Sequence, residues 1–155
     1  MDYKKIDTQE LNRMLLDRIQ ELEREGFVDH HFRECHSLKE DSGLSFFLDL
    51  IPVFFSDVFQ VVKELAHALN QPVVNFREIY SQFIKLKGCS ACFGACRIRD
   101  ACSNLRQAID NKSKEGCIQA LNSIEDECKS LRDRLDGIIK VKNDILSYFY
   151  SIRFL

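Results

Sequence analysis

The C-terminal part of this chain carries apolar residues at alternating spacings of four and three, a pattern that a long amphipathic helix places on one face. The positions are Cys117, Leu121, Ile124, Cys128, Leu131, Leu135 and Ile138, and the pattern continues through Ile145, Phe149 and Ile152. Such a heptad-like seam suits a helix that packs against its neighbours at about 20°. The seam therefore predicts a helix over residues 114–152 in an all-α fold.

Five further helices are expected before this one. Gly26 ends the first helix, Asp41 to Gly43 breaks the second, and Asn75 suits the N-cap of the fourth. The six predicted helices span roughly residues 8–25, 29–39, 44–69, 75–92, 94–110 and 114–152. Pro52 lies inside the third helix and predicts a kink there, because proline removes a backbone hydrogen bond. Four long helices with short connections predict an antiparallel four-helix bundle, flanked by two shorter N-terminal helices, in a single domain of residues 1–155.

Charge and composition exclude several classes of function. The 155 residues have a net charge of −2 with both signs mixed along the chain, whereas a nucleic-acid binder needs a basic block or face. No uncharged apolar run reaches the ~18 residues of a membrane span, and the N-terminus lacks the apolar core of a secretory signal. Seven cysteines without such a signal indicate reduced thiols. We expect a protein of the cytoplasm and nucleus that binds neither nucleic acid nor membrane.

One apolar residue of the predicted fourth helix lies off its buried face. Apolar residues at positions 76, 79, 83 and 86 follow the spacing of a buried stripe. Ile84 projects roughly 120° from that stripe, on the side of Ser81 and Gly88. A glycine inside a helix costs about 1 kcal/mol relative to alanine. An exposed isoleucine followed by Lys87 and Gly88 therefore indicates a small apolar patch, edged by positive charge, that another molecule approaches.

The same stretch resembles the signature of a known family. The run Ile84-Lys-Leu-Lys-Gly-Cys-Ser-Ala-Cys-Phe-Gly-Ala is similar to His-Gln-Leu-Lys-Gly-Ser-Ser-x-Ser-Ile-Gly-Ala, the signature of plant histidine-containing phosphotransfer proteins. The matching residues are Leu86, Lys87, Gly88, Ser90, Gly94 and Ala95. The resemblance extends upstream through Gly26-Phe-Val-Asp-x-x-Phe32 and Val53-Phe-Phe-x-Asp57, and downstream to Cys102. Because isoleucine occupies the position of the phosphorylated histidine, the chain resembles the pseudo-phosphotransfer branch, which keeps the fold and lacks that histidine.

The resemblance implies binding without catalysis. In the family, an imidazole nitrogen takes a phosphoryl group from a receiver aspartate and passes it on, with a lysine beside the phosphate at the position of Lys87. Ile84 has no lone pair to attack phosphorus, so phosphorelay through this position is excluded. Its side chain remains a good apolar docking contact. The implied function is that of a monomeric competitor, not an enzyme and without cofactor or metal, that binds receiver domains of histidine kinases and response regulators and inhibits a relay such as cytokinin signalling.

The expected receiver-binding surface centres on this helix and extends over the two helices before it. Its residues are Ile84, Ser81, Lys85, Lys87 and Gly88, together with Arg33, His36, Asp49 and Ser56. Three positions depart from the family signature. The family's glutamine after the histidine is Lys85 here, and two of its serines are Cys89 and Cys92.

Two other classes of function remain open. Cys89, Cys92 and Cys96 have a spacing that suggests zinc or an iron–sulfur cluster. No second cysteine or histidine pair completes a ligand set, and small packing thiols are the favoured interpretation, although a metal-binding bundle or a helical scaffold is an alternative. A phosphocarrier that uses a relocated histidine, at His36 or His67, is the other alternative. Neither of these histidines has the Lys-Gly context of the signature.

Overall fold

Six helices make up the structure, a computed structural model that describes the backbone of residues 8–37 and 43–153 and the side chains of residues 13–34, 49–137 and 140. The helices are α1 (Thr8–Arg24), α2 (His30–Ser37), α3 (Gly43–Leu69), α4 (Phe76–Phe93), α5 (Cys96–Asp110) and α6 (Lys114–Arg153). The described residues contain no strand, so the predicted all-α class is confirmed. Each predicted helix is present, with ends that differ from the prediction by at most two residues.

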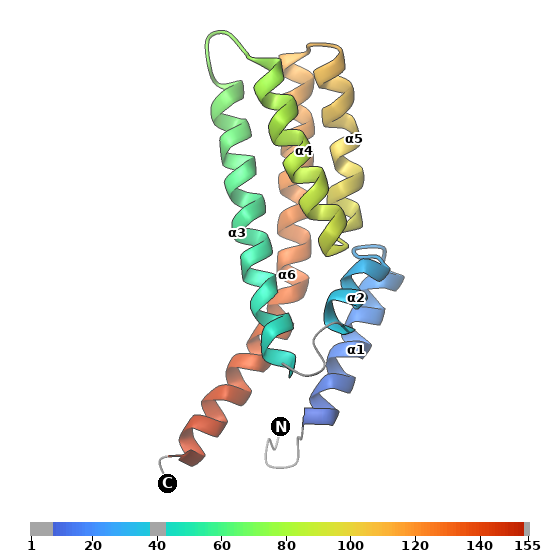
Figure 1. The fold of residues 1–155 in the computed structure, drawn as a ribbon, viewed down its shortest axis with the longest axis vertical. Coiled ribbons are helices and arrows are strands. Elements are labelled where there is room, and N and C mark those ends of the chain that lie inside the picture. Colours follow the sequence, from blue (N-terminus) through green and yellow to red (C-terminus); the bar gives the residue numbers. More distant parts are fainter. Residues whose placement is uncertain (1–7, 38–42, 154–155) are drawn as a thin grey trace.

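The four helices α3, α4, α5 and α6 stand side by side in alternating directions, as Figure 1 shows. Neighbouring contacts join α3 to α4, α4 to α5, α5 to α6 and α6 to α3, which closes the predicted antiparallel four-helix bundle. The helices α1 and α2 lie at one end of the bundle (Figure 1). Helix α1 has 17 residues and ends one residue before the end of the predicted range 8–25. Its apolar face at Leu15, Ile19 and Leu22 is buried.

The core follows the periodicity that the sequence showed. The α6 seam is buried at every position whose side chain is described, from Cys117 to Leu135; Ile138 lies outside those side chains. On α4 the buried residues are Ile79, Phe83, Leu86, Ser90 and Phe93. These stripes turn toward the bundle axis, which leaves the opposite face of each helix to solvent.

The N-terminal pair is fastened to the bundle by aromatic and charged contacts. Phe27, just after α1, lies between two guanidinium groups: that of Arg97 on α5 at 4.4 Å and that of Arg134 on α6 at 4.3 Å from the ring centroid. Arg134 also pairs with Glu25. Such cation–π contacts each contribute roughly 0.5–1 kcal/mol at exposed sites. Together they fix the end of α1 against α5 and α6.

Both ends of α4 are capped by residues that the sequence singled out. Asn75 is the N-cap, and its side-chain oxygen accepts hydrogen bonds from the amides of Arg77 at 3.1 Å and Glu78 at 3.3 Å. At the other end Gly94 has φ 85°, the left-handed conformation that glycine adopts without strain. A Cβ at this position would overlap the amide nitrogen of Phe32 and come within 2.9 Å of the Asp29 carboxylate. Gly94 is therefore required where α2 approaches the end of α4.

The third helix continues through Pro52 from Gly43 to Leu69. The kink expected at this proline stays a prediction. Within the described residues, none of the helices combines the length and the apolar character that a membrane crossing needs.

Candidate functional site

The candidate site is the solvent-facing side of α4, named here the α4 outer face. Its residues are Tyr80, Ser81, Ile84, Lys85, Lys87 and Gly88, all of them exposed. Ile84 is 48% exposed and Tyr80, one turn earlier, is 40% exposed, whereas Phe83 beside them is 1% exposed. The helical spacing thus placed Ile84 correctly, because residues at i and i+4 share a face. Two large apolar side chains in solvent form the centre of this face.

Gly88 is a glycine that the fold itself does not require. Its backbone is helical, and apart from the neighbouring backbone of the same helix no atom lies within 4 Å of the place where a Cβ would be. Nothing in this chain's own packing needs a glycine there, although glycine lowers helix stability by about 1 kcal/mol relative to alanine. Gly94, six residues further, is needed for the fold. The two glycines of the motif therefore differ, and Gly88 leaves a bare stretch of backbone open to the outside.

Positive charge edges the α4 outer face on both sides. Lys87 lies toward α5: its Nζ is 6.0 Å from the centroid of the Phe83 ring, and its charge acts on Cys102 of that helix. Lys85 lies on the other side, one turn from Cys89, whose pKa is raised by burial and by the charge of Asp57 on α3. Neither lysine forms an ion pair with any residue whose side chain is described. Both cations are therefore available to an outside partner.

The flank of the site is the first half of α3. The Phe54 and Phe93 rings stack with centroids 4.0 Å apart, which places the start of α3 beside the end of α4. Asp49 and Ser56, both predicted from the sequence, are exposed on α3. The sequence missed two neighbours, Val53 and Asp57. Val53 is 56% exposed, and its spacing of four from Asp49 and from Asp57 was the signal that puts all three on one side of the helix.

The predicted contribution of α2 is only partly visible. Arg33 is exposed, but its guanidinium lies 3.6 Å from the carboxylate of Glu23 on α1. Its charge is thus used in part within the chain. His36 belongs to α2, and its side chain lies outside the described residues. The structure places α2 against both α3 and α4.

Comparison with known proteins decides the family. The family model of the Hpt domain matches residues 49–135, which run from within α3 to within α6 and include α4 and α5. The chain belongs to the Hpt domain family. A histidine-containing phosphotransfer protein 2 from Oryza sativa subsp. japonica is 30% identical over 125 residues, covering 80% of this chain and 84% of the relative. The X-ray structure of a histidine-containing phosphotransfer protein from rice has a TM-score of 0.81 and 27% identity, over 90% of this chain and 98% of that chain.

A pseudo histidine-containing phosphotransfer protein 2 from Oryza sativa subsp. japonica also matches this Hpt domain. It is 22% identical over 142 residues, covering 92% of this chain and 94% of the relative. Relatives of both names therefore share the fold of this chain. The predicted resemblance to plant phosphotransfer proteins is confirmed, and the assignment to one branch depends on the chemistry of residue 84.

Among the cysteines whose side chains the structure describes, Cys89 and Cys96 of the predicted cluster have different surroundings. Cys96 donates a hydrogen bond to the carbonyl of Gly26 at 3.3 Å, while Cys89 faces α3. Burial, with the nearby Asp57 and Cys92, raises the pKa of Cys89, and burial with Asp29 raises that of Cys96. A raised pKa disfavours the thiolate that binds metal or reacts. The interpretation as small packing residues agrees with the half-buried positions of Cys89 and Cys96, but it was wrong for Cys92, which is exposed.

The histidines whose side chains are described differ in their surroundings. His67 is exposed and lines a shallow groove between the end of α3 and the start of α6, with Lys114 and Ile118. Among the residues the structure describes, this groove shares no side chain with the α4 outer face. His30 is exposed. His31 also lies at the surface, with its side chain 45% exposed, and its ring hydrogen-bonds to Asp29.

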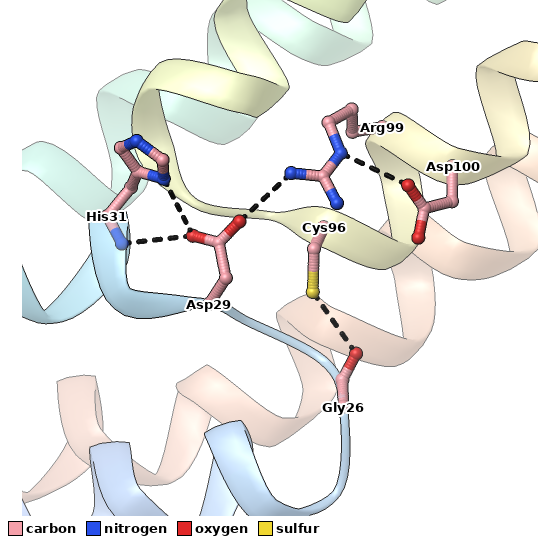
Figure 2. Close-up of polar contacts among 6 residues, drawn as sticks. All are labelled: Gly26, Asp29, His31, Cys96, Arg99 and Asp100. Carbon is pink, nitrogen blue, oxygen red and sulfur yellow. Dashed lines mark hydrogen bonds and ion pairs between the residues drawn. The ribbon is translucent and has the colours of Figure 1, made fainter.

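A polar cluster around Asp29 joins the start of α2 to the start of α5 (Figure 2). One carboxylate oxygen accepts from the amide and ring Nδ1 of His31, at 3.0 and 3.1 Å. The other oxygen accepts from Arg99 at 3.0 Å, and Arg99 also donates to Asp100 at 3.1 Å. Burial alone would raise the pKa of Asp29, but these hydrogen bonds and the charges of His31 and Arg99 hold it below its usual value.

The ligand atoms of Asp29, His30 and His31 form the one group of three that lie close enough to hold a metal among the described residues. Arg99 already supplies a cation at the Asp29 carboxylate. A metal ion there would face the charge of that guanidinium. The cluster is therefore a structural junction, which sequence reasoning missed because Asp29 and Arg99 are 70 positions apart.

Proposed function

We propose that this Hpt domain is a pseudo-phosphotransfer protein that binds receiver domains without accepting phosphate. Hpt domains interact with receiver domains of histidine kinases and response regulators in phosphorelays. The observation that carries the proposal is the exposed Ile84 at the phosphorylated position, with Lys87 and Gly88 of the signature kept beside it. A hydrocarbon side chain has no lone pair, so it forms no bond to phosphorus.

The physical case for docking rests on what the α4 outer face gains when it is covered. Full burial of an isoleucine contributes about 1.5–3 kcal/mol, so covering the exposed half of Ile84 contributes about 1 kcal/mol. Tyr80 and Val53 add further exposed apolar surface. Gly88 lets a partner backbone come close without displacing any atom of this chain. The surface suits a modest, transient interface.

The biological consequence is competition. A protein that occupies receiver domains without transferring phosphate removes them from the active phosphotransfer proteins, and so lowers the flow of phosphate to response regulators. The plant relatives favour a multistep relay of the cytokinin type as the setting. A competitor of this kind acts as a monomer wherever receivers are found, in the cytoplasm and the nucleus.

The test compares the native protein with Ile84→His in a receiver titration and a phosphotransfer assay. Ile118→His is the matched control, because Ile118 is also exposed, at 40%, but lies on α6. We expect the native protein and both variants to bind a plant histidine-kinase receiver domain, and only Ile84→His to take phosphate. Acid-labile phosphate on the native protein would contradict the proposal and point to a relocated histidine. Loss of receiver binding in all three proteins would contradict it as well.

A further inference from the structure

We infer that the α4 outer face selects receivers in their phosphorylated state and holds the phosphoryl group without taking it. The inference rests on the proposed function, and it concerns which form of the receiver is bound. Its basis is the pair of lysines, Lys85 and Lys87, that bracket Ile84. Lys85 stands where the family signature has an uncharged glutamine, so this chain has one more cation beside the reaction position than the signature provides.

The two lysines approach Ile84 from opposite sides. With about 100° per residue, Lys85 points about 100° to one side of Ile84 and Lys87 about 60° to the other. The Nζ of Lys87 lies 6.0 Å from the centroid of the Phe83 ring, on the side of α4 away from Lys85. Lys85 shares its side of the helix with Cys89, one turn further along. A group held opposite Ile84 thus meets a cation on each side.

No acidic side chain neutralises these cations in the part of the chain with described side chains. Asp57 is the acidic group of α3 nearest to this side, and it acts on Cys89 without pairing with a lysine. Glu64, further along α3, accepts a hydrogen bond from Gln60 at 3.2 Å. Glu78 is exposed on α4, about two turns before Lys85. The pair therefore keeps its positive charge for a partner.

Phosphorylation of a receiver makes the group opposite Ile84 more negative. A carboxylate carries one negative charge, whereas a phosphorylated side chain carries about −1.5 to −2. The additional charge lies where phosphoryl transfer would occur in the family, directly between the two lysines. Because Ile84 supplies no nucleophile, no bond forms or breaks in this complex. The phosphoryl group stays on the receiver, which is held in a complex that leads to no transfer.

The experiment measures the affinity for one receiver domain with magnesium, in the presence and absence of beryllofluoride, which mimics the phosphoryl group. The native protein should bind the beryllofluoride form about three- to tenfold more tightly, the range that Coulomb's law gives for one extra unit charge roughly 7 Å from two cations in water. Lys85→Gln should remove about half of this preference on the free-energy scale. The control Lys129→Gln, an exposed lysine of α6, has the same change in net charge and should keep it.

The outcomes separate the two proposals. Equal affinity for the two receiver forms would overturn the inference and leave the proposed function standing. Binding to neither form would overturn the proposed function itself. A preference that Lys85→Gln leaves at its native size would overturn the role of the lysine pair, and a preference that shrinks as ionic strength rises would support it.

Discussion

Gly88 offers a substitution for which folding and binding should change in opposite directions. The residue is helical and exposed, and an added Cβ meets no atom within 4 Å. Gly88→Ala should therefore stabilise the protein by about 1 kcal/mol, the difference in helix propensity between the two residues. For a domain of this size, that gain raises the melting temperature by about 2–4 °C.

Receiver binding should weaken in the same variant. If a partner backbone packs against the bare helix at Gly88, the new methyl group overfills the contact. Overpacking costs roughly 1–3 kcal/mol in a close-packed site, which corresponds to a loss of affinity of about five- to 150-fold. The assays are chemical denaturation followed by circular dichroism, and titration of the variant into a receiver domain.

The comparison variant is Gly94→Ala, at the second glycine of the motif. Alanine in the left-handed conformation costs about 1–2 kcal/mol, and the overlap with the Phe32 amide adds to that strain. This variant should lose about 2–4 kcal/mol of stability. The reasoning would be refuted by a Gly88→Ala protein that is less stable than the native one, or by one that binds receivers with unchanged affinity.

Three further predictions follow from the caps, the Asp29 cluster and the buried thiols. Asn75→Ala should lower the free energy of unfolding by about 1 kcal/mol in urea denaturation, because two amides of α4 lose their acceptor. Asp29→Asn should destabilise the protein at pH 7. The lowered pKa of Asp29 gives stability that is present above its unfolded pKa of about 3.8 and is lost as the pH falls through the folded value. The loss of stability in the variant should therefore be smaller in denaturation curves at pH 3, and a larger loss there would contradict the prediction. Burial raises the pKa of Cys102 and of Cys128 to about 12, so iodoacetamide at pH 8 should leave both unmodified in the native protein and modify both in urea, as judged by mass spectrometry.

The fold could be predicted from the sequence because each bundle helix buries one regular apolar stripe. The seam from Cys117 to Leu135 and the stripe of α4 identify these two segments as helices with one buried face. In the structure, Asn75 caps the start of α4 and Gly94 caps its end. The contacts that hold the end of α1 could not be predicted, because they join residues that are far apart in the sequence. Phe27, for example, is fixed by two arginines that are distant in sequence.

The candidate site could be predicted from the sequence only in part, for a related reason. The exposure of Ile84 follows from the period of its own helix, which the sequence contains. The exposure of Val53 beside the end of α4 depends on how α3 is rotated relative to α4, and that rotation is set by packing such as the Phe54–Phe93 stack. The ion pair between Arg33 and Glu23 likewise depends on how α2 folds back on α1.

The half-exposed position of Ile84 also bears on how phosphotransfer activity is lost. The core is complete without this side chain, so folding places little demand on what occupies position 84. A histidine and an isoleucine there should give proteins of similar stability and abundance. An activity that depends on one such side chain disappears in a single substitution, while the molecule that remains is well folded and still shaped for its former partners. Under the proposed function, replacing a histidine at this position yields an antagonist directly, with no misfolded intermediate for the cell to clear.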